Sequence, residues 1–235
     1  MELEKVTSSA KSTEKRWYDD ACGAALAMEF VGERWSLLIL RELMFGPRRF
    51  GEIKAQLTGI SANVLTQRLG GMEAAGLLSR RTLPSPASVQ VYELTGWGYE
   101  IEPVFQTLGR WAVRSPRHDP TLPLSPASAM LSLRTMIDHR RLGDWRAGVG
   151  FRLDGDRFLA SLGDGELVIA RRAPDGADAV VECGTTTLVR MVYGKWPIAE
   201  AEAAGLATLS GDRAIWERFV ALFALPVKIE AAPRD

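Results

Sequence analysis

The chain has 235 residues, of which 46% are hydrophobic and 25% charged, with 29 basic and 29 acidic side chains. This composition is typical of a globular protein and excludes a disordered or fibrous chain. No apolar run approaches the roughly 18 residues of a membrane span, and the polar N-terminus lacks the apolar core of a secretory signal. We therefore expect a cytoplasmic protein that makes no contact with membranes.

The chain also lacks the residues that most enzymes and metal proteins need. Two cysteines and two histidines are too few for a disulfide framework or a four-ligand zinc site. The motifs GxSxG and HExxH and the dinucleotide-binding glycine fingerprint are absent from the sequence, so nothing points to a nucleophile, a zinc protease or a nucleotide cofactor. We expect no catalytic residue, no metal and no cofactor, and therefore no enzyme.

Composition shifts divide the chain into four segments. A stretch with four prolines in twelve residues separates a mainly helical part from a part with strand-like runs, and proline favours extended linkers. We predict a mobile segment at 1–16, a helical domain with a hairpin at 17–114, a linker at 115–126 and an α+β domain at 127–235. Residues 34–81 carry eight basic and three acidic side chains, a modest excess of the kind that favours nucleic acid.

Three short helices are predicted in the first domain. The run WSLLILRELM has helical spacing of apolar residues and ends at Gly46 and Pro47, and RRFGEIKAQL is a second amphipathic helix beginning near Arg48. A tight turn with the sequence TGI follows, and Ser61 is a good N-cap for a third helix over about 62–75. Two short helices joined by a tight turn containing glycine form a helix-turn-helix.

The third helix has two contrasting faces. Leu65, Leu69 and Met72 form an apolar stripe that we expect to be buried. The opposite stripe is short and polar, and its Asn63 and Gln67 are of the types that pair with adenine in the major groove. After this helix, LSRRTL and VQVYELT predict the hairpin of a winged helix. The candidate DNA contacts are Ser61, Asn63, Thr66, Gln67, Arg68, Arg48, Arg49, Lys54, Arg80 and Arg81.

The order of these motifs resembles a known family. WSLLILREL, GPRRFGEI, GISANVLTQRL and YELTGWGYEI, spread between Cys22 and Trp111, are similar to the HxlR-type winged helix-turn-helix transcriptional regulators. The resemblance implies a homodimer formed through the helices at about 18–31 and 97–114, with the third helix in the major groove and the wing on the flanking backbone. The wing tip here, LPSPASVQVY, lacks the arginine that this family usually has.

Cys22 is a candidate redox site by the same resemblance. Family members commonly have Cys-Pro near this point, and in some of them the cysteine senses oxidants, whereas here the pair is Cys22-Gly23. Glu29 and Glu33 follow in the sequence and would disfavour a thiolate if they lay close to it. A lone cysteine is more often a small buried residue, so both interpretations stay open.

The second domain alternates strands and helices. The runs GVGFRLDG, DRFLASLGDG, GELVIARR and DAVVEC predict strands, and helices are predicted over about 127–142, 185–194 and 197–204. Asp212 can cap a last helix, AIWERFVALFAL. The run from Val180 to Phe223 is similar to the end of sterol carrier protein type 2-like domains, which implies a sheet covered by helices around an apolar tunnel.

Seven aromatic residues of this domain could line such a tunnel: Trp145, Phe151, Phe158, Trp196, Trp216, Phe219 and Phe223. Aromatic residues at these positions equally suit an ordinary core. The leading hypothesis is a dimeric, sequence-specific regulator that binds double-stranded DNA at an inverted repeat and responds to a small apolar effector in the second domain. The alternatives are a thiol-based redox regulator acting through Cys22, and a lipid or small-molecule carrier whose winged domain serves dimerisation.

Overall fold

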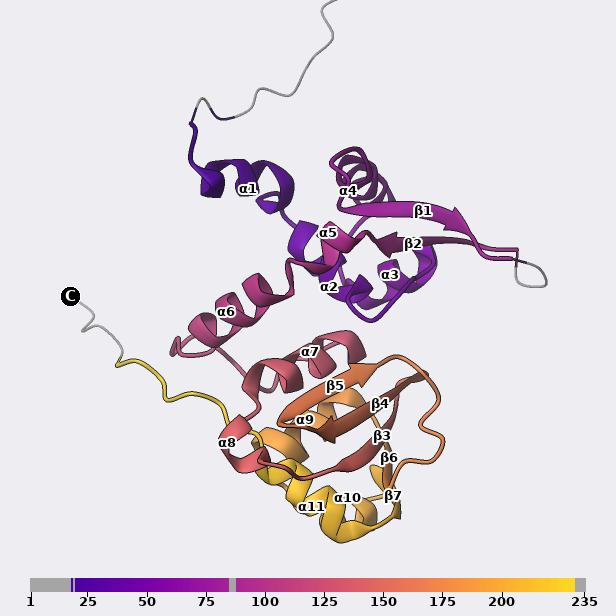
Figure 1. Ribbon diagram of the computed structural model, residues 1–235, viewed down its shortest axis with the longest axis vertical. Helices are drawn as coiled ribbons and strands as arrows, with labels where there is room; N and C mark the ends of the chain where they lie inside the picture. Colours follow the sequence, from indigo (N-terminus) through magenta and orange to yellow (C-terminus); the bar gives the residue numbers. More distant parts are fainter. Residues whose placement is uncertain (1–17, 19, 85–87, 231–235) are drawn as a thin grey trace, which may run out of the picture.

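The computed structural model describes residues 18, 20–84 and 88–230. Figure 1 shows a helical module with a β-hairpin above a sheet with its own helices, and α6 and α7 lie between the two parts. The upper part contains α1 Gly23–Val31, α2 Ser36–Leu43, α3 Phe50–Gln56, α4 Ala62–Ala74, β1 Leu78–Thr82, β2 Gln90–Leu94, α5 Gly96–Tyr99 and α6 Glu102–Ala112. The predicted N-terminal segment 1–16 lies outside the described residues.

The predicted helix-turn-helix is present with small changes in its boundaries. Leu65, Leu69 and Met72 are buried, as the helical spacing predicts, and the Oγ atom of Ser61 accepts a hydrogen bond from the N–H of Val64 at the start of α4. The second helix begins at Phe50 rather than near Arg48. Arg48 pairs with Tyr92 through two backbone hydrogen bonds, so its backbone extends the wing instead of the helix.

The two predicted flanking helices are shorter than expected. The first begins at Gly23, and the second is divided into α5 and α6. Phe30 of α1 packs edge-on against Trp97 of α5, with ring centroids 5.3 Å apart. This contact joins α1 to α5 beside the helix-turn-helix.

The second half is an α+β arrangement. It contains α7 Pro126–Met136, α8 His139–Leu142, β3 Ala147–Leu153, β4 Asp156–Gly163, β5 Glu166–Ala170, β6 Ala179–Cys183, α9 Thr185–Tyr193, α10 Ile198–Ala203, β7 Ala207–Gly211 and α11 Arg213–Ala221. The strand order is β5-β4-β3-β6-β7, with β3 and β6 parallel and the other neighbours antiparallel. Asp212 caps α11 through its Oδ1 atom, as predicted.

One face of the sheet carries the core. Phe151 and Phe158 are opposite each other on β3 and β4, and α7, α9 and α11 pack on this side. The predicted single helix over 127–142 is interrupted after Met136, because Ile137 bridges to Phe223 and the N–H of Asp138 donates to the carbonyl of Leu222. On the opposite face Val168 is 59% exposed.

The two halves meet through a mixed polar and apolar interface. Phe45, just after α2, packs edge-on against Phe158, with ring centroids 5.6 Å apart. The guanidinium of Arg48 forms an ion pair with Asp156, and the hydroxyl of Ser125 donates to the buried carboxylate of Glu42 over 2.7 Å. The buried hydrophobic core is continuous through these contacts, and the predicted domain limits at 115–126 stay a prediction.

Candidate nucleic-acid interface

The polar face of α4 is free for an external partner. Asn63, Thr66 and Gln67 are exposed, and none of their side chains forms a hydrogen bond with another residue in the described ranges. A surface helix that only needs solubility would more usually carry lysine and glutamate here. Exposed amides and hydroxyls without internal partners are suited to hydrogen bonding with base edges.

Two glycines continue this face. A Cβ atom at Gly70 or Gly71 would meet no heavy atom within 4 Å, and neither residue has a positive φ. Neither packing nor backbone conformation within the chain therefore requires glycine, although each costs roughly 1 kcal/mol of helix propensity relative to alanine. Close approach of an external backbone to α4 would explain both.

The candidate basic residues divide into free and paired groups. Arg49 and Lys54 are exposed on and before α3. On the wing, the side chain of Arg80 is 50% exposed and lies 4.0 Å from Glu73, and Arg81 forms an ion pair with Glu93. Exposed ion pairs of this kind exchange readily for phosphate because each contributes little in water.

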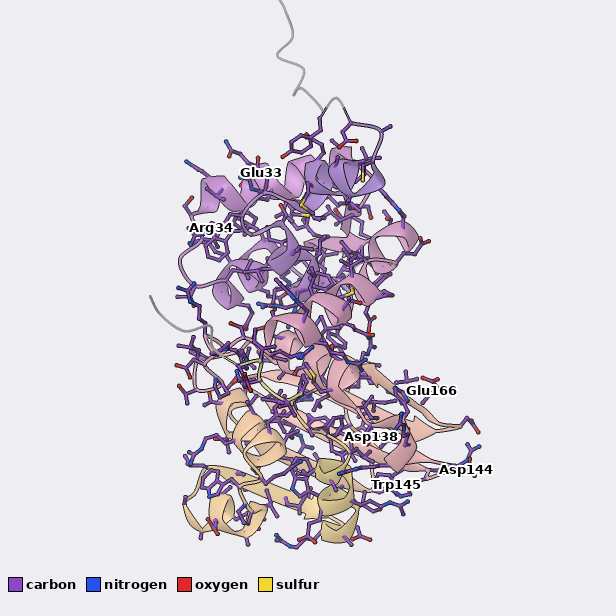
Figure 2. All side chains as sticks on the ribbon, turned by 90° about the vertical axis from the view of Figure 1, so that its left-hand side faces the viewer. Glu33, Arg34, Asp138, Asp144, Trp145 and Glu166 are labelled. Carbon is purple, nitrogen blue, oxygen red and sulfur yellow. The ribbon has the colours of Figure 1, made fainter. Side chains whose placement is uncertain are left out.

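Arg48 and Arg68 are placed differently from the expectation that they face phosphate. The side chain of Arg48 is only 10% exposed and points into the interface with β4, where Asp156 neutralises it. Arg68 donates to Glu33 over 2.8 Å and to the carbonyl of Arg34 over 3.2 Å. Figure 2 shows Glu33 and Arg34 on the surface of the helical module. Arg68 therefore fastens α4 to the turn before α2.

The hairpin pairs in the register expected of a wing. Leu78 lies opposite Leu94 and Thr82 opposite Gln90, so Arg80 and Arg81 lie on its first strand, close to α4. The tip residues 85–87, within the run that lacks the arginine usual in the resembled family, are outside the described ranges. Arg80 lies beside Glu73 of α4, whereas Arg81, the next residue of the strand, pairs with Glu93 of the hairpin.

The first half of the chain matches known regulators. The model of the HxlR-like helix-turn-helix family matches residues 30–119. The HTH-type transcriptional regulator YodB of Bacillus subtilis (strain 168) is 37% identical over 86 residues, which are 37% of this chain and 77% of that protein. This chain belongs to the HxlR-like helix-turn-helix family. The uncharacterized HTH-type transcriptional regulator YvaP of the same strain is 34% identical over 87 residues, 37% of this chain and 80% of its own length.

A solved structure of a family member is also similar. The reduced form of YodB from B. subtilis is 34% identical, covers 42% of this chain and 98% of that chain, and has a TM-score of 0.38. Membership of the HxlR-like family, whose matched members are transcriptional regulators, confirms the prediction that the chain is not an enzyme. The family match ends at residue 119, so the likeness of the second half to sterol carrier proteins remains a prediction.

The predicted aromatic pocket of this HxlR-like protein is densely packed. Phe151, Phe158, Trp216, Phe219 and Phe223 are each at most 1% exposed, and the ring centroids of Phe219 and Phe223 are 4.8 Å apart. The remaining two predicted residues lie on other surfaces. Trp145, labelled in Figure 2, is covered by Arg218 at 4.4 Å, and Trp196 by Arg190 at 4.1 Å. The structure thus does not gather the seven residues around one space.

A cavity lies elsewhere, between α2, α6, α7 and α9. Sequence reasoning missed this site, because its walls come from four helices and from residues 118–124, with no motif to connect them.

Within the described ranges, no group of three or more acidic, histidine or cysteine side chains is arranged to hold a metal ion. No helix in the same ranges is long and apolar enough to cross a bilayer.

The two cysteines have opposite environments. Cys22 is exposed at the N-cap of α1, where the backbone N–H groups of Ala24 and Ala25 lower the pKa of its thiol. The expected opposing effect of Glu29 and Glu33 is not among the causes of this shift. Burial raises the pKa of Cys183 to about 12. Cys22 is therefore the more reactive thiol of the two.

Proposed function

We propose that the protein is a dimeric, sequence-specific DNA-binding transcriptional regulator whose operator affinity responds to a small apolar effector. The observation that carries the proposal is the face of α4, where Asn63, Thr66 and Gln67 are exposed without internal partners. Arg49 and Lys54 are exposed on and before α3, and Arg80 and Arg81 are exposed on the wing. We expect these four side chains to hold phosphates beside the α4 face. Recognition would follow the winged-helix arrangement, with α4 in the major groove and the hairpin beside the backbone.

Exposed apolar residues support the dimer. Large apolar side chains that are 45–73% exposed lie on α1, α5 and α6: Leu26, Met28, Trp97, Val104 and Trp111. Such a concentration on adjoining helices is typical of a surface that another protein covers. A twofold dimer predicts an inverted repeat with half-sites about one helical turn apart.

The direct test is fluorescence anisotropy with DNA from upstream of the protein's own gene, at about physiological salt, with random duplex as competitor. Binding that survives the competitor supports a sequence-specific regulator. Binding that the competitor removes equally from both duplexes contradicts the proposal and favours a carrier module whose winged part only dimerises.

Replacing Gln67 with alanine is expected to reduce the preference for the operator over random duplex by about 1–3 kcal/mol, the typical value of one bidentate base contact. Non-specific affinity should change little, because Gln67 carries no charge and is already exposed. Anisotropy titrations on both duplexes measure the ratio. Equal losses on operator and random DNA would show that Gln67 does not read bases.

The matched control is Arg80→Ala. Arg80 is half-exposed on the wing. Its loss should weaken binding to both duplexes by the same factor and reduce the slope of log affinity against log salt by about one. An unchanged slope would place Arg80 away from the DNA.

A second candidate function is thiol-based regulation through Cys22, favoured by its exposure and its lowered pKa. At pH 7.5 iodoacetamide should modify Cys22 at least about 100-fold faster than Cys183, because a thiol whose pKa is about 12 is almost entirely protonated. Mass spectrometry of tryptic peptides measures both rates. Unfolding in urea should equalise them, and similar rates in the folded protein would remove the basis for a switch.

The regulatory consequence needs a separate measurement. If Cys22 controls DNA binding, mild oxidant should change operator affinity in the native protein and leave the Cys22→Ser variant unaffected. An equal response of both proteins would assign the effect to another residue.

A further inference from the structure

The apolar cavity between α2, α6, α7 and α9 lies at the junction of the two halves. It has a volume of about 560 Å³ and is lined mainly by aliphatic side chains, including Leu37, Leu108, Val113, Leu131, Met136 and Val189. Small-molecule sites typically have volumes of about 300–1,000 Å³ and a mostly apolar lining with a few polar groups. This recess has the size and lining of such a site, whereas the aromatic cluster of the second half is filled by its own rings.

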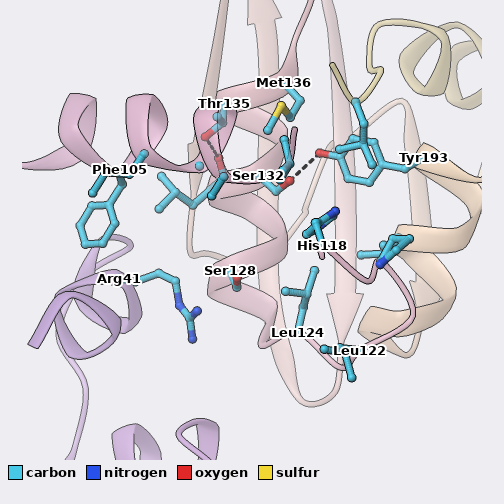
Figure 3. A pocket seen from close by; sticks show the side chains of 18 of the residues that line it. Arg41, Phe105, His118, Leu122, Leu124, Ser128, Ser132, Thr135, Met136 and Tyr193 are labelled. Carbon is cyan, nitrogen blue, oxygen red and sulfur yellow. Dashed lines mark hydrogen bonds between the residues drawn. The ribbon is translucent and has the colours of Figure 1, made fainter. Parts of the chain in front are cut away.

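Polar groups are few and lie at defined points of the wall (Figure 3). The hydroxyls of Ser132 on α7 and Tyr193 on α9 share a hydrogen bond of 2.7 Å, and burial raises the pKa of Tyr193, which keeps it protonated. This pair retains both donor and acceptor capacity for a third oxygen.

The charged groups at the wall are already neutralised or lie at its edge. The Nε and Nη2 atoms of Arg41 donate to the Oε1 atom of Glu42 over 3.0 and 2.8 Å. The pKa of His118 is lowered by burial and by Lys228, so its ring is neutral at pH 7. Asp119 is fully exposed and accepts hydrogen bonds from Thr121. No uncompensated buried charge in this part of the structure calls for an ionic ligand.

We propose that this cavity binds a neutral, largely apolar small molecule whose single carbonyl or hydroxyl oxygen hydrogen-bonds to Ser132 and Tyr193. A carboxylate or an ammonium ligand would lose its hydration without gaining an unpaired opposite charge. An alkane-like ligand would leave the hydroxyl pair without a new partner. One polar oxygen on an apolar skeleton matches both parts of the wall.

The position of the cavity connects it to the DNA-binding face. Leu37, Leu38 and Arg41 of α2 form part of the wall, and the other side of α2 buries Ile39 and Leu40 in the core that supports α4. A ligand held between α2 and α7 would favour one spacing of these helices. Coupling of this kind is reciprocal, so operator DNA would change ligand affinity by the same factor. This regulatory step rests on the proposed function, whereas binding to the cavity does not.

The binding test uses Nile red, a neutral apolar dye with one carbonyl group, and the full-length protein. We expect saturable binding with a blue-shifted emission. In Gly109→Leu the new side chain enters the cavity, and the Cβ position has room because its nearest neighbour, Cγ2 of Thr135, is 3.9 Å away. Leucine also favours the helical conformation of α6. This variant should bind the dye at least tenfold more weakly.

Two further variants make the result specific. Ala203→Leu adds the same kind of bulk at an exposed position of α10 and should leave dye binding unchanged. Tyr193→Phe removes one hydroxyl and should weaken binding about threefold to tenfold, the effect of one hydrogen bond. If thermal unfolding shows that Gly109→Leu is not folded, Ser128→Phe replaces it, because Ser128 lines the same wall from α7.

The outcomes separate the two proposals. Dye binding that is equal in the native protein, the cavity-filling variant and Ala203→Leu would overturn the cavity as the site, as would a native protein that does not bind the dye. Weaker binding in the cavity-filling variant and in Tyr193→Phe, with unchanged binding in Ala203→Leu, supports the proposed site. A dye-dependent change of operator anisotropy, absent in that variant, supports the regulatory step. Dye binding without this change overturns the regulatory step and leaves the binding site standing.

Discussion

Replacing Asp156 with asparagine is expected to lower the free energy of unfolding by about 3–5 kcal/mol, the usual cost of breaking a buried ion pair from one side. The carboxylate of Asp156 forms an ion pair with Arg48, and its Oδ1 atom lies 3.8 Å from Nε of Arg171. These three side chains are only 10–15% exposed. Without the carboxylate, the two guanidinium groups would lose the one acidic side chain with which both form an ion pair.

In Arg171 the cost of burying a charge is set against favourable contacts with its neighbours. Its Nε, Nη1 and Nη2 atoms are buried without a hydrogen-bond partner in the described structure, and burial together with the neighbouring Arg48 lowers its pKa to about 10. Arg171 therefore costs folding free energy in its charged form, which persists at all pH values below about 10. Part of that cost is offset by its position over the Phe158 ring, 5.3 Å from the centroid.

This balance supplies a matched control. Arg171→Met keeps an apolar side chain over the Phe158 ring and removes a buried guanidinium that has no hydrogen-bond partner, so it should change the free energy of unfolding by less than about 1 kcal/mol. Urea titrations followed by circular dichroism measure both variants. A loss smaller than 1 kcal/mol for Asp156→Asn would show that water reaches the cluster and that it does not hold the two halves together.

The same cluster shows what could not be predicted from sequence. The basic character of Arg48 and its place beside a helix-turn-helix suggested a phosphate contact, but its partner Asp156 lies 108 residues away in the chain. Ser125 and Glu42 are likewise separated by 83 residues. Sequence periodicity contains no information about such pairs, because each is fixed only when the sheet docks against α2 and the wing.

Features set by neighbouring residues were predictable. The buried stripe of α4 follows from a period of 3.6 residues, and the caps at Ser61 and Asp212 follow from residue type and position. Helix boundaries were wrong where a distant strand or helix intervened, as at Arg48, which pairs with Tyr92, and at Ile137, which bridges to Phe223. The cavity beside α2 was not predictable for the same reason, since distant elements form its wall.

The aromatic cluster of the second half either belongs to the core or lines a ligand tunnel, and the free energy of unfolding distinguishes these alternatives. Phe219→Ala is expected to lower the free energy of unfolding by about 3–5 kcal/mol, as for a fully buried phenylalanine. The ring of Phe219 is inaccessible to solvent, with ring centroids of Phe151 at 5.7 Å, Trp216 at 6.0 Å and Phe223 at 4.8 Å. Truncating a side chain that lined an open ligand tunnel would lower the free energy of unfolding by less, because one side of its ring would have no packing contacts to lose.

Trp145→Ala provides the comparison, since Trp145 is half-buried and its ring is covered mainly by Arg218. Its loss should cost about 1 kcal/mol, in the range of a partly exposed cation–π contact. Urea unfolding of both variants, together with Nile red binding, gives the decision. A large stability loss in Phe219→Ala with unchanged dye affinity assigns the aromatic cluster to the core. A small stability loss with a large fall in dye affinity would instead show that the dye binds among the aromatic residues of the second half and not in the cavity beside α2.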